Sequence, residues 1–280
     1  MSISSRSLET GTAPVLVLSP RYSSDSRILR LAAIQRGWQV ERLGGWDVPA
    51  RLLSRKLIFS GEFSYSKVIA HKLSWALLDA PPDWLLSLPI HYRKRTLEYT
   101  TLAEARTLSQ ARFVKPAIDK VFAATVYPSG AHLFEASQGL ADTIPVLVSE
   151  PVCWDVEYRF FVCERRVVTF SSYWSGDRST RLDDGTWQVE SGEIAEAQHF
   201  MDSLLTDAHV KLPPAIVIDV GKIRDRGWAV IEANAAWAAG IYGCDPLQVL
   251  SVLEHACVHR AHLTPDLAAW ECNRDAKRAR

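Results

Sequence analysis

The sequence predicts a small α/β unit followed by a larger α+β unit built from helices and hairpin-linked strands. A chain of 280 residues is at the length where one hydrophobic core usually divides into two. The N-terminal part alternates strand, helix and strand, which is typical of a parallel α/β layer. Beyond residue 95, short strands and hairpins dominate instead. We therefore expect a disordered tail over residues 1–12, an α/β domain over 13–95, a second domain over 96–265 and a charged tail over 266–280.

The first unit is predicted from a buried strand and the helix that follows it. Val15 to Leu18 form a continuous apolar run, of the kind buried on both faces of a parallel sheet, and Pro20 follows closely. From Ser24 to Gln35 apolar residues recur at helical spacing, and Gly37 provides the stop. The remaining elements expected here are strands over 38–43 and 55–59 and a helix over 66–79.

The second unit is predicted to open with a short helix over residues 101–108. Its last helix has a strong start signal, because Asp245 can cap it and Pro246 suits the first helical position. We expect that helix to run to about His262, and a further helix over 192–208. The strands expected in this unit cover residues 112–115, 122–127, 145–149, 157–162, 166–173, 215–220 and 228–233.

Charge and cysteine content argue against several classes of protein. The formal net charge is zero, so no field of one sign indicates a nucleic acid or an anionic membrane as partner. The five cysteines form no CxxC pair, which favours reduced thiols over a disulfide framework or a cysteine-bound metal. No apolar run approaches the roughly 18 residues that a membrane helix needs. We expect a soluble cytoplasmic protein with neither nucleic-acid nor membrane partners; the sequence does not indicate its oligomeric state.

Two apolar strands near the C-terminus carry polar side chains at facing positions. A polar loop separates these strands, so we expect an antiparallel hairpin. The hairpin would place Asp219 across from Glu232, and Val217 across from Asn234. Two facing carboxylates repel each other, and a cation between them is the simplest remedy. Oxygen ligands of this kind suit Mg²⁺, so the hairpin is a candidate metal site.

Strand alternation predicts the face on which these polar groups lie. Glu232 and Asn234 are two residues apart and should point the same way, with Trp228 and Val230 behind them on that face. The alternative is that the two carboxylates of the hairpin are separate strand-end groups, in water or paired with Lys222 or an arginine.

Two lysines lie upstream, at the end of an apolar strand and in the loop after it. Lys115 follows Phe113 and Val114, and a lysine inside an apolar strand is costly to desolvate unless an anion meets it. A phosphate would serve as that anion, with Lys120 beside it. The alternative is that Lys115 extends to solvent and Lys120 is an ordinary loop charge.

A second pair of features lies between residues 146 and 162. A strand runs into Glu150-Pro151-Val152, and the proline leaves backbone groups of Glu150 and Val152 available to bond a planar ligand edge. In the next strand Glu157 and Arg159 share one face. Arginine on a rigid strand is a good clamp for phosphoryl oxygens, while the alternative is a surface ion pair between the two.

The order of these features resembles the ATP-grasp superfamily. The stretches "FVKP…DK", "SEPV", "EYRFFV", "VIDVG" and "VIEANAAWAAGIYG" are similar to its clade named for one arginine and two lysines. The resemblance covers roughly Leu88 to Cys257. It implies an ATP-grasp fold, and the α/β unit before it is similar to the small pre-ATP-grasp domain of such proteins.

This resemblance implies a role for each candidate residue. Lys115 and Lys120 would contact the ATP phosphates, and Lys120 and Arg159 would act in catalysis. One departure from many relatives is that the segment 116–121 contains no glycine, so a glycine-rich lid is not implied. The other implied roles are adenine binding by Glu150 and Val152, ribose binding by Glu157, γ-phosphoryl binding by Arg159, and Mg²⁺ ligation by Asp219, Glu232 and Asn234, with Glu232 bridging two ions.

The implied activity is that of a Mg-ATP-dependent ligase. It would join a carboxylate to an amine, or to a thiol, through an acyl phosphate, with small-molecule or peptide substrates that the sequence does not identify. The alternative is a catalytically silent module that binds or senses ATP, and a structural partner-binding protein is a third candidate.

Three further features have alternative interpretations. His255, His259 and His262 would lie on one helix face, as a zinc site or as a solvated surface. Trp237 could pack in the core or form a wall of the substrate pocket. Arg21, Tyr22 and Asp25 follow the first strand, where open α/β sheets bind ligands, although Asp25 could also cap a helix.

Overall fold

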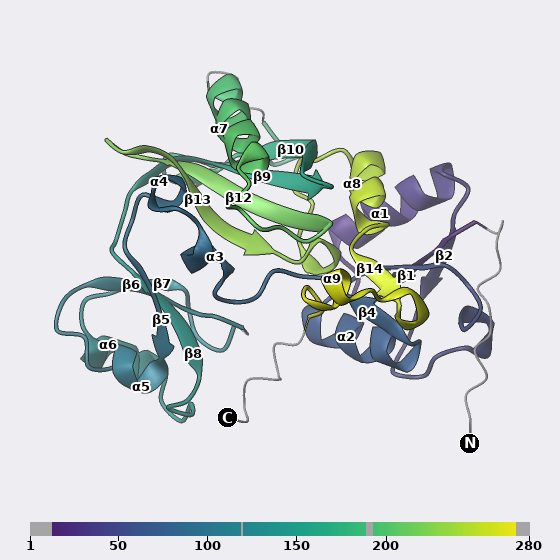
Figure 1. The fold of residues 1–280 in the computed structure, drawn as a ribbon, viewed down its shortest axis with the longest axis horizontal. Helices are drawn as coiled ribbons and strands as arrows, with labels where there is room; N and C mark the ends of the chain where they lie inside the picture. The colour runs from purple at the N-terminus through teal and green to yellow at the C-terminus, as the bar shows by residue number, and fades with distance from the viewer. Residues whose placement is uncertain (1–12, 119, 189–192, 273–280) are drawn as a thin grey trace.

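The computed structural model describes residues 13–118, 120–188 and 193–272. The tail predicted over 1–12 and the larger part of the tail predicted over 266–280 therefore lie outside the described residues. Figure 1 shows the five-stranded central sheet between a three-stranded and a four-stranded sheet, and a two-stranded sheet is also present in the described residues. None of the helices in these ranges is both long and apolar enough to span a membrane.

The N-terminal sheet is parallel, as the sequence predicts. Strand β1 (Val15–Leu18) lies between β2 (Gln39–Arg42) and β3 (Leu57–Ser60). The four residues of β1 are buried, because helices cover both faces of the sheet. Two of these helices are α1 (Ser24–Gln35), capped by the Ser23 side chain, and α2 (Phe63–Lys72).

The helix predicted over 66–79 is wrong at its C-terminal end. Helix α2 ends at Lys72, and Ser74 adopts a left-handed backbone conformation with φ +62° that turns the chain out of the helix. Strand β4 (Trp75–Leu77) follows at once. Short helical segments then complete this part of the chain: η1 (Ala50–Leu52) before β3, and α3 (Trp84–Ser87) and α4 (Ile90–Arg93) after β4.

The last long helix begins as predicted and ends earlier than predicted. Asp245 accepts hydrogen bonds from the first-turn amides of α8 (Pro246–Leu253). The chain then forms β14 (Cys257–His259), which pairs antiparallel with β4, and two short helices follow, η3 (Arg260–His262) and α9 (Pro265–Ala268). A helix to His262 is therefore wrong, because the backbone of β14 finds a partner strand far earlier in the chain that local patterning does not reveal. The three histidines share no helix face, so that basis for a zinc site is lost.

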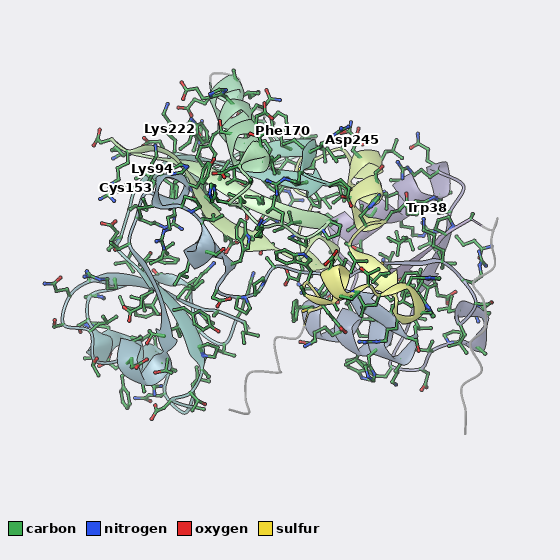
Figure 2. The ribbon with its side chains drawn as sticks, in the orientation of Figure 1. Trp38, Lys94, Cys153, Phe170, Lys222 and Asp245 are labelled. Atoms are coloured by element: carbon green, nitrogen blue, oxygen red, sulfur yellow. The ribbon has the colours of Figure 1, made fainter. Side chains whose placement is uncertain are left out.

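The central sheet is antiparallel and buries both of its faces. Helix α7 (Ile194–Thr206) covers one face, where Tyr158, Phe160 and Ile218 pack with Met201. On the opposite face, Phe161 and Val217 join the core of the N-terminal sheet. Figure 2 shows Phe170 beneath α7 and Asp245 at the start of α8. The sheet order is β11 (Arg178–Ser179), β10 (Arg166–Ser175), β9 (Trp154–Cys163), β12 (Ala215–Ile223) and β13 (Gly227–Asn234). The helix predicted over 192–208 corresponds to α7, and its predicted first residue, Gly192, lies outside the described residues.

A small four-stranded sheet completes the fold. Its order is β5 (Leu97–Thr101), β8 (Pro145–Ser149), β6 (Arg112–Pro116) and β7 (Thr125–Tyr127), with α5 (Leu102–Ala105) and α6 (Gly130–Ala136) on one side. The helix predicted over 101–108 is one turn long, because Thr101 serves as its cap and Thr107 already lies beyond it. Alternate residues of β6 and β8 pack into the core of this small sheet, which leaves their other faces to line a cavity.

Candidate active site

The acidic hairpin has the predicted register. Strands β12 and β13 pair antiparallel with Asp219 opposite Glu232 and Val217 opposite Asn234. On its other side β12 pairs with β9, where Arg159 lies opposite Asp219. Three adjacent strands therefore bring an arginine and two carboxylates to neighbouring positions on one face of the central sheet.

The predicted face of the apolar neighbours is wrong because β13 contains a bulge. Asp219 faces Glu232, but Val220 faces Val230, so Ile231 is an extra residue in the ladder. Trp228 and Val230 consequently point into the core under α7, whereas Glu232 points to the opposite face. The indole nitrogen of Trp228 donates a hydrogen bond to Glu196 of α7, at 2.9 Å, which confirms its direction.

Arg159 and Asp219 form a buried bidentate ion pair. Arg159 Nε donates to Asp219 Oδ1 at 2.8 Å and Nη2 donates to Oδ2 at 2.6 Å, and both side chains are almost fully buried. Burial alone would lower the pKa of Arg159, but the charge and hydrogen bonds of Asp219 raise it above the ordinary value. Arg159 also donates to the carbonyl of Gly240 at 2.9 Å and lies over the ring of Tyr242.

Lys115 and Glu232 form a second ion pair beside the first. Lys115 Nζ donates to Glu232 Oε2 at 2.6 Å. Burial alone would raise the pKa of Glu232, but the charge and hydrogen bond of Lys115 outweigh it and lower the pKa to about 2. The Asn234 amide donates to both Asp219 and Glu232 at 3.1 Å, so one amide links the two ion pairs.

Both carboxylates of the hairpin pair with basic side chains, Glu232 with Lys115 and Asp219 with Arg159, and the metal site stays a prediction. Lys222, one of the partners considered for these carboxylates, does not pair with them. It donates instead to Glu193 and Glu196 on α7. Arg159, Lys115 and the Asn234 amide together offset the repulsion between the two carboxylates. Glu157 and Arg159 do share a face, but Arg159 pairs with Asp219 and not with Glu157.

A cavity of about 280 Å³ extends from this network between the small sheet and the central sheet. Lys115 and Glu232 of the network line it, and so do Glu150, Val152 and Glu157. Apolar side chains from both sheets form its walls, in the mixture of apolar surface and few polar groups that is common in small-ligand sites. Those walls include Leu85, Leu97, Phe113, Ala124, Val126, Leu147, Trp154 and Ile231.

The Glu150 side chain already has hydrogen-bond partners within the protein. Its carboxylate accepts hydrogen bonds from the Thr96 amide at 3.0 Å and from Arg226 at 2.8 Å. The hydrogen bond from Arg226 is the main reason that the pKa of Glu150 is lowered. A ligand edge at this point would therefore meet main-chain groups of Glu150 and Val152 rather than the carboxylate.

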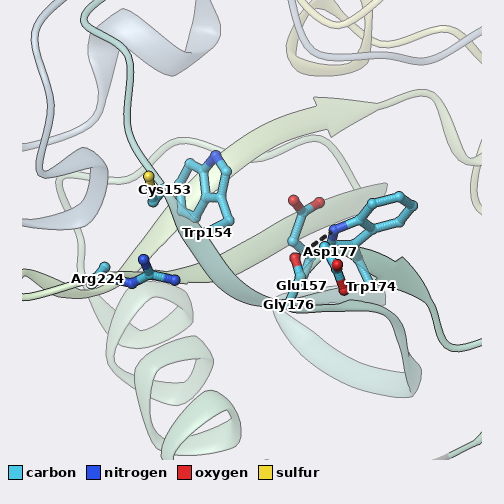
Figure 3. Close-up of a pocket in the computed structure, with 7 residues that line it drawn as sticks. All are labelled: Cys153, Trp154, Glu157, Trp174, Gly176, Asp177 and Arg224. Carbon is cyan, nitrogen blue, oxygen red and sulfur yellow. Dashed lines mark hydrogen bonds between the residues drawn. The ribbon is translucent and has the colours of Figure 1, made fainter.

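Glu157 lines both this cavity and a second, larger pocket, here called the outer pocket. The outer pocket measures about 630 Å³ and is lined by Cys153, Trp154, Glu157, Trp174, Gly176, Asp177 and Arg224, as Figure 3 shows. Trp154 and Glu157 line both spaces. The Tyr173 hydroxyl donates to Glu157 at 2.5 Å, yet burial is the larger effect and raises the pKa of Glu157.

Lys120 is not brought to the network. It is exposed in the loop between β6 and β7, and it does not line the cavity. Trp237 is fully buried and donates to the Leu78 carbonyl, so the core interpretation of this residue is confirmed and the pocket-wall interpretation is wrong. Asp25 does not cap α1, since Ser23 does; its carboxylate accepts from the Ile241 amide at 3.0 Å, beside Gly240.

Three site residues were not identified from the sequence. Arg95 is buried, lines the cavity and stacks on Trp154 at 5.1 Å from the ring centroid, and burial lowers its pKa to about 10. Tyr173 and Tyr242 stack on each other beside Arg159, with ring centroids 4.9 Å apart. Arg95 stands in a run of basic residues that is typical of a surface. Tyr242 has φ +48°, which no sequence motif indicates.

The oxygen ligands that the hairpin offers suit a hard divalent cation, provided that oxygens from outside the hairpin also bind the cation. Two carboxylates and one amide oxygen are the ligand types that Mg²⁺ takes, usually together with water and substrate phosphates. Within the described ranges, no group of three His, Cys, Asp or Glu side chains is placed to hold a metal by itself. A cation here would therefore depend on oxygens from a ligand in the cavity.

Comparison with known proteins identifies the fold. Residues 92–252 match the family model of an ATP-grasp domain, family 2 of the clade named for one arginine and two lysines. The search of curated proteins gives no match.

Three solved structures have similar folds at low sequence identity. D-cycloserine synthetase DcsG has a TM-score of 0.50 and 16% identity, covering 86% of this chain and 98% of that one. D-alanine–D-alanine ligase from Bacillus anthracis has a TM-score of 0.52 and 13% identity, covering 88% and 97%. N5-carboxyaminoimidazole synthase from Aspergillus clavatus, solved with ADP, has a TM-score of 0.53 and 12% identity, covering 87% and 77%.

Proposed function

Because the chain belongs to family 2 of the one-arginine, two-lysine clade of ATP-grasp domains, we propose that it is a Mg-ATP-dependent ligase that joins a carboxylate to an amine or a thiol. The observation that supports this most strongly is the network of Lys115, Glu232, Asn234, Asp219 and Arg159, of which Lys115 and Glu232 line the cavity. The network contains two positively charged side chains that can bind phosphate. It also contains three side chains whose oxygens can ligate Mg²⁺.

The nucleotide would occupy the cavity between the two sheets. The adenine would lie between the apolar walls, with its polar edge against the main chain of Glu150 and Val152. The ribose hydroxyls would meet the Glu157 carboxylate, which lines both the cavity and the outer pocket. The phosphates would then point toward Lys115 and Arg159. In this proposal Lys120 reaches the phosphates only if its loop moves, since it is exposed in the structure.

Binding of Mg-ATP would exchange the partners of both ion pairs. Lys115 and Arg159 would pass from carboxylates to phosphate oxygens, and Asp219, Glu232 and Asn234 would be free to hold one or two Mg²⁺ ions. Since each base and each carboxylate keeps a partner of opposite charge, the exchange leaves no buried charge unpaired. Bound Mg²⁺ would supply charge neutralisation at the transferring phosphoryl group.

The chain's own part in the reaction is positioning and electrostatics. A substrate carboxylate would attack the γ-phosphorus of ATP, forming an acyl phosphate and releasing ADP. Arg159 and Lys115 would hold the phosphoryl oxygens while negative charge spreads over them. The acceptor amine or thiol would then attack the acyl carbon and release inorganic phosphate, which gives an amide or a thioester.

A catalytically silent ATP-binding module remains the second candidate. Such a module needs the cavity, Lys115 and the main chain of Glu150 and Val152. It does not need Asp219, Glu232 and Asn234 together. Retention of all three oxygen donors in one hydrogen-bonded group favours the ligase.

The two candidates are separated by following ADP and phosphate during incubation with Mg-ATP and a panel of amino acids, dipeptides and carboxylic acids. Release of ADP that depends on an acceptor supports the ligase. Saturable ATP binding without ADP release across the whole panel would favour the silent module, and the absence of ATP binding would exclude both.

A further inference from the structure

The bulge in β13 determines whether Glu232 lies in the site at all. Upstream of the bulge, Trp228 and Val230 point into the core under α7; downstream of it, Glu232 and Asn234 point to the cavity face. In a regular strand, residues 228, 230, 232 and 234 would all share one face. If β13 were regular at Ile231, with no bulge, the Glu232 carboxylate would therefore point into an apolar core and away from Asp219.

Arg95 holds the two carbonyl groups at which this bulge forms. Its Nη1 donates to the Val230 carbonyl at 2.7 Å, and its Nη2 donates to the Ile231 carbonyl at 2.9 Å. These are the residue before the extra residue and the extra residue itself. A bulge disrupts the regular ladder, and β13 is also the edge strand of the central sheet. The planar guanidinium presents two Nη groups in a fixed fork to two adjacent carbonyls, whereas a lysine has a single ammonium nitrogen without that fixed geometry.

The backbone turn at Lys94 and its contacts with Arg226 position Arg95 beside β13. Lys94 has a left-handed backbone with φ +46° at the end of α4, which turns the following residue toward the edge of β13. Lys94 Nζ donates to the Arg226 carbonyl, and Arg226 donates back to the Lys94 carbonyl. Figure 1 shows α4 beside β13, and Figure 2 shows Lys94 and Cys153 at the same end of the central sheet.

We propose that Arg95 is a positioning residue that fixes the β13 bulge and so turns Glu232 into the metal-binding face beside Asp219. The guanidinium also lines the nucleotide cavity and stacks on Trp154, so it links the base-binding region to the metal ligands through main-chain carbonyls. The consequence for metal binding rests on the proposed function, whereas the effect on the bulge does not.

The test compares Arg95→Met with Arg165→Met. Arg165 is a matched control, because its guanidinium also donates to main-chain carbonyls, those of Leu205, Asp207 and Val210, but it lies outside the cavity.

Mn²⁺ affinity is measured by electron paramagnetic resonance with the non-hydrolysable ATP analogue AMP-PNP at saturation, and stability is measured by thermal unfolding. We expect Arg95→Met to weaken Mn²⁺ binding about 10-fold or more. Arg165→Met should leave Mn²⁺ binding within about 2-fold at a similar loss of thermal stability. Arg95→Lys keeps the charge but loses the planar fork of two Nη groups, so its effect should fall between the two.

A crystal structure of Arg95→Met without nucleotide tests the bulge independently of metal. We expect loss of the extra residue in the ladder or displacement of the Glu232 carboxylate from Asn234. An intact bulge with Glu232 in place would overturn the inference whatever the wild type binds, as would wild-type Mn²⁺ affinity in Arg95→Met. Failure of the wild type to bind Mn²⁺ with AMP-PNP, with a displaced Glu232 in the variant, would overturn the proposed function and leave the role of Arg95 in the bulge supported. If Arg95→Met does not fold, Arg95→Lys serves for both measurements.

Discussion

Lys115 Nζ lies 2.6 Å from Glu232 Oε2, and this ion pair joins the small sheet to the central sheet in the lining of the cavity. Lys115 comes from β6 and Glu232 from β13, with a separation of 117 positions in the sequence. In the proposed function Lys115 binds phosphate and Glu232 binds the metal. Binding of a nucleotide with its metal must therefore break this ion pair.

Replacement of Glu232 by glutamine should abolish Mg²⁺-dependent turnover without unfolding the chain. The amide keeps the shape of the side chain but removes the charge that a metal needs, and loss of several kcal/mol of stabilisation corresponds to about 100-fold or more in rate. ADP release under saturating Mg-ATP is the measurement. Glu98→Gln, at an exposed carboxylate of β5, is the control and should behave as wild type. Turnover in Glu232→Gln equal to that of Glu98→Gln would show that Glu232 is not a metal ligand.

The ion pair should also make stability depend on pH in the acid range. The folded-state pKa of Glu232, about 2, lies below its ordinary value of 4.5. The charged form therefore stabilises the fold above pH 4.5, and this contribution is lost as the pH falls from 4.5 toward 2. Since the side chain is partly exposed, we expect a loss on the order of 1–2 kcal/mol. Urea unfolding of wild type and Glu232→Gln from about pH 7 to pH 2 should show curves that converge in this window; parallel curves would contradict the assignment.

Breaking the Arg159 and Asp219 pair should cost more than removing both charges. Arg159→Met leaves a buried carboxylate without its partner, which typically costs about 3–5 kcal/mol. Asp219→Asn in the same chain removes that uncompensated charge, so the double variant should recover part of the loss. A double-mutant cycle of unfolding free energies measures the coupling. Additive effects would indicate that the two side chains do not interact in solution.

Replacement of Glu157 by glutamine should reduce the preference for a ribose over a deoxyribose. A hydrogen bond from a sugar hydroxyl to a carboxylate is worth about 1.5–3 kcal/mol, so ATP binding should weaken about 10-fold or more while 2′-deoxy-ATP binding changes less. Calorimetric titration with the two nucleotides gives both affinities. Asp177→Asn, in the outer pocket of Figure 3, is the matched control. An equal loss for both nucleotides would place the ribose elsewhere.

The hairpin shows what the sequence could and could not predict about the site. The facing of Asp219 and Glu232 follows from two apolar strands and the loop between them, and it is confirmed. The bulge at Ile231 could not be predicted from local patterning, and the residue that bonds the carbonyls of the bulge, Arg95, lies far away in the sequence. An arginine was among the partners considered for the two carboxylates, but the sequence did not indicate that Arg159 pairs with Asp219 or that Lys115 pairs with Glu232, because both partners lie far away in the sequence.

The C-terminal part of the fold shows the same limit. The start of α8 is encoded locally by Asp245 and Pro246 and was predicted correctly. The end of that helix, and the end of α2, are set by the pairing of β4 with β14. Each of these strands is three residues long, too short for alternation to reveal, and each forms only because the other is present.

Calorimetric titration of AMP-PNP into wild type and Glu232→Gln, with and without Mg²⁺, tests the exchange of ion-pair partners most directly. In wild type we expect one nucleotide per chain, with affinity about 10-fold or more higher when Mg²⁺ is present, because the metal takes Glu232 as phosphate takes Lys115. In Glu232→Gln the effect of Mg²⁺ should largely disappear. Equal affinity with and without Mg²⁺ in wild type, or no binding at all, would contradict the assignment of this network as a Mg-ATP site.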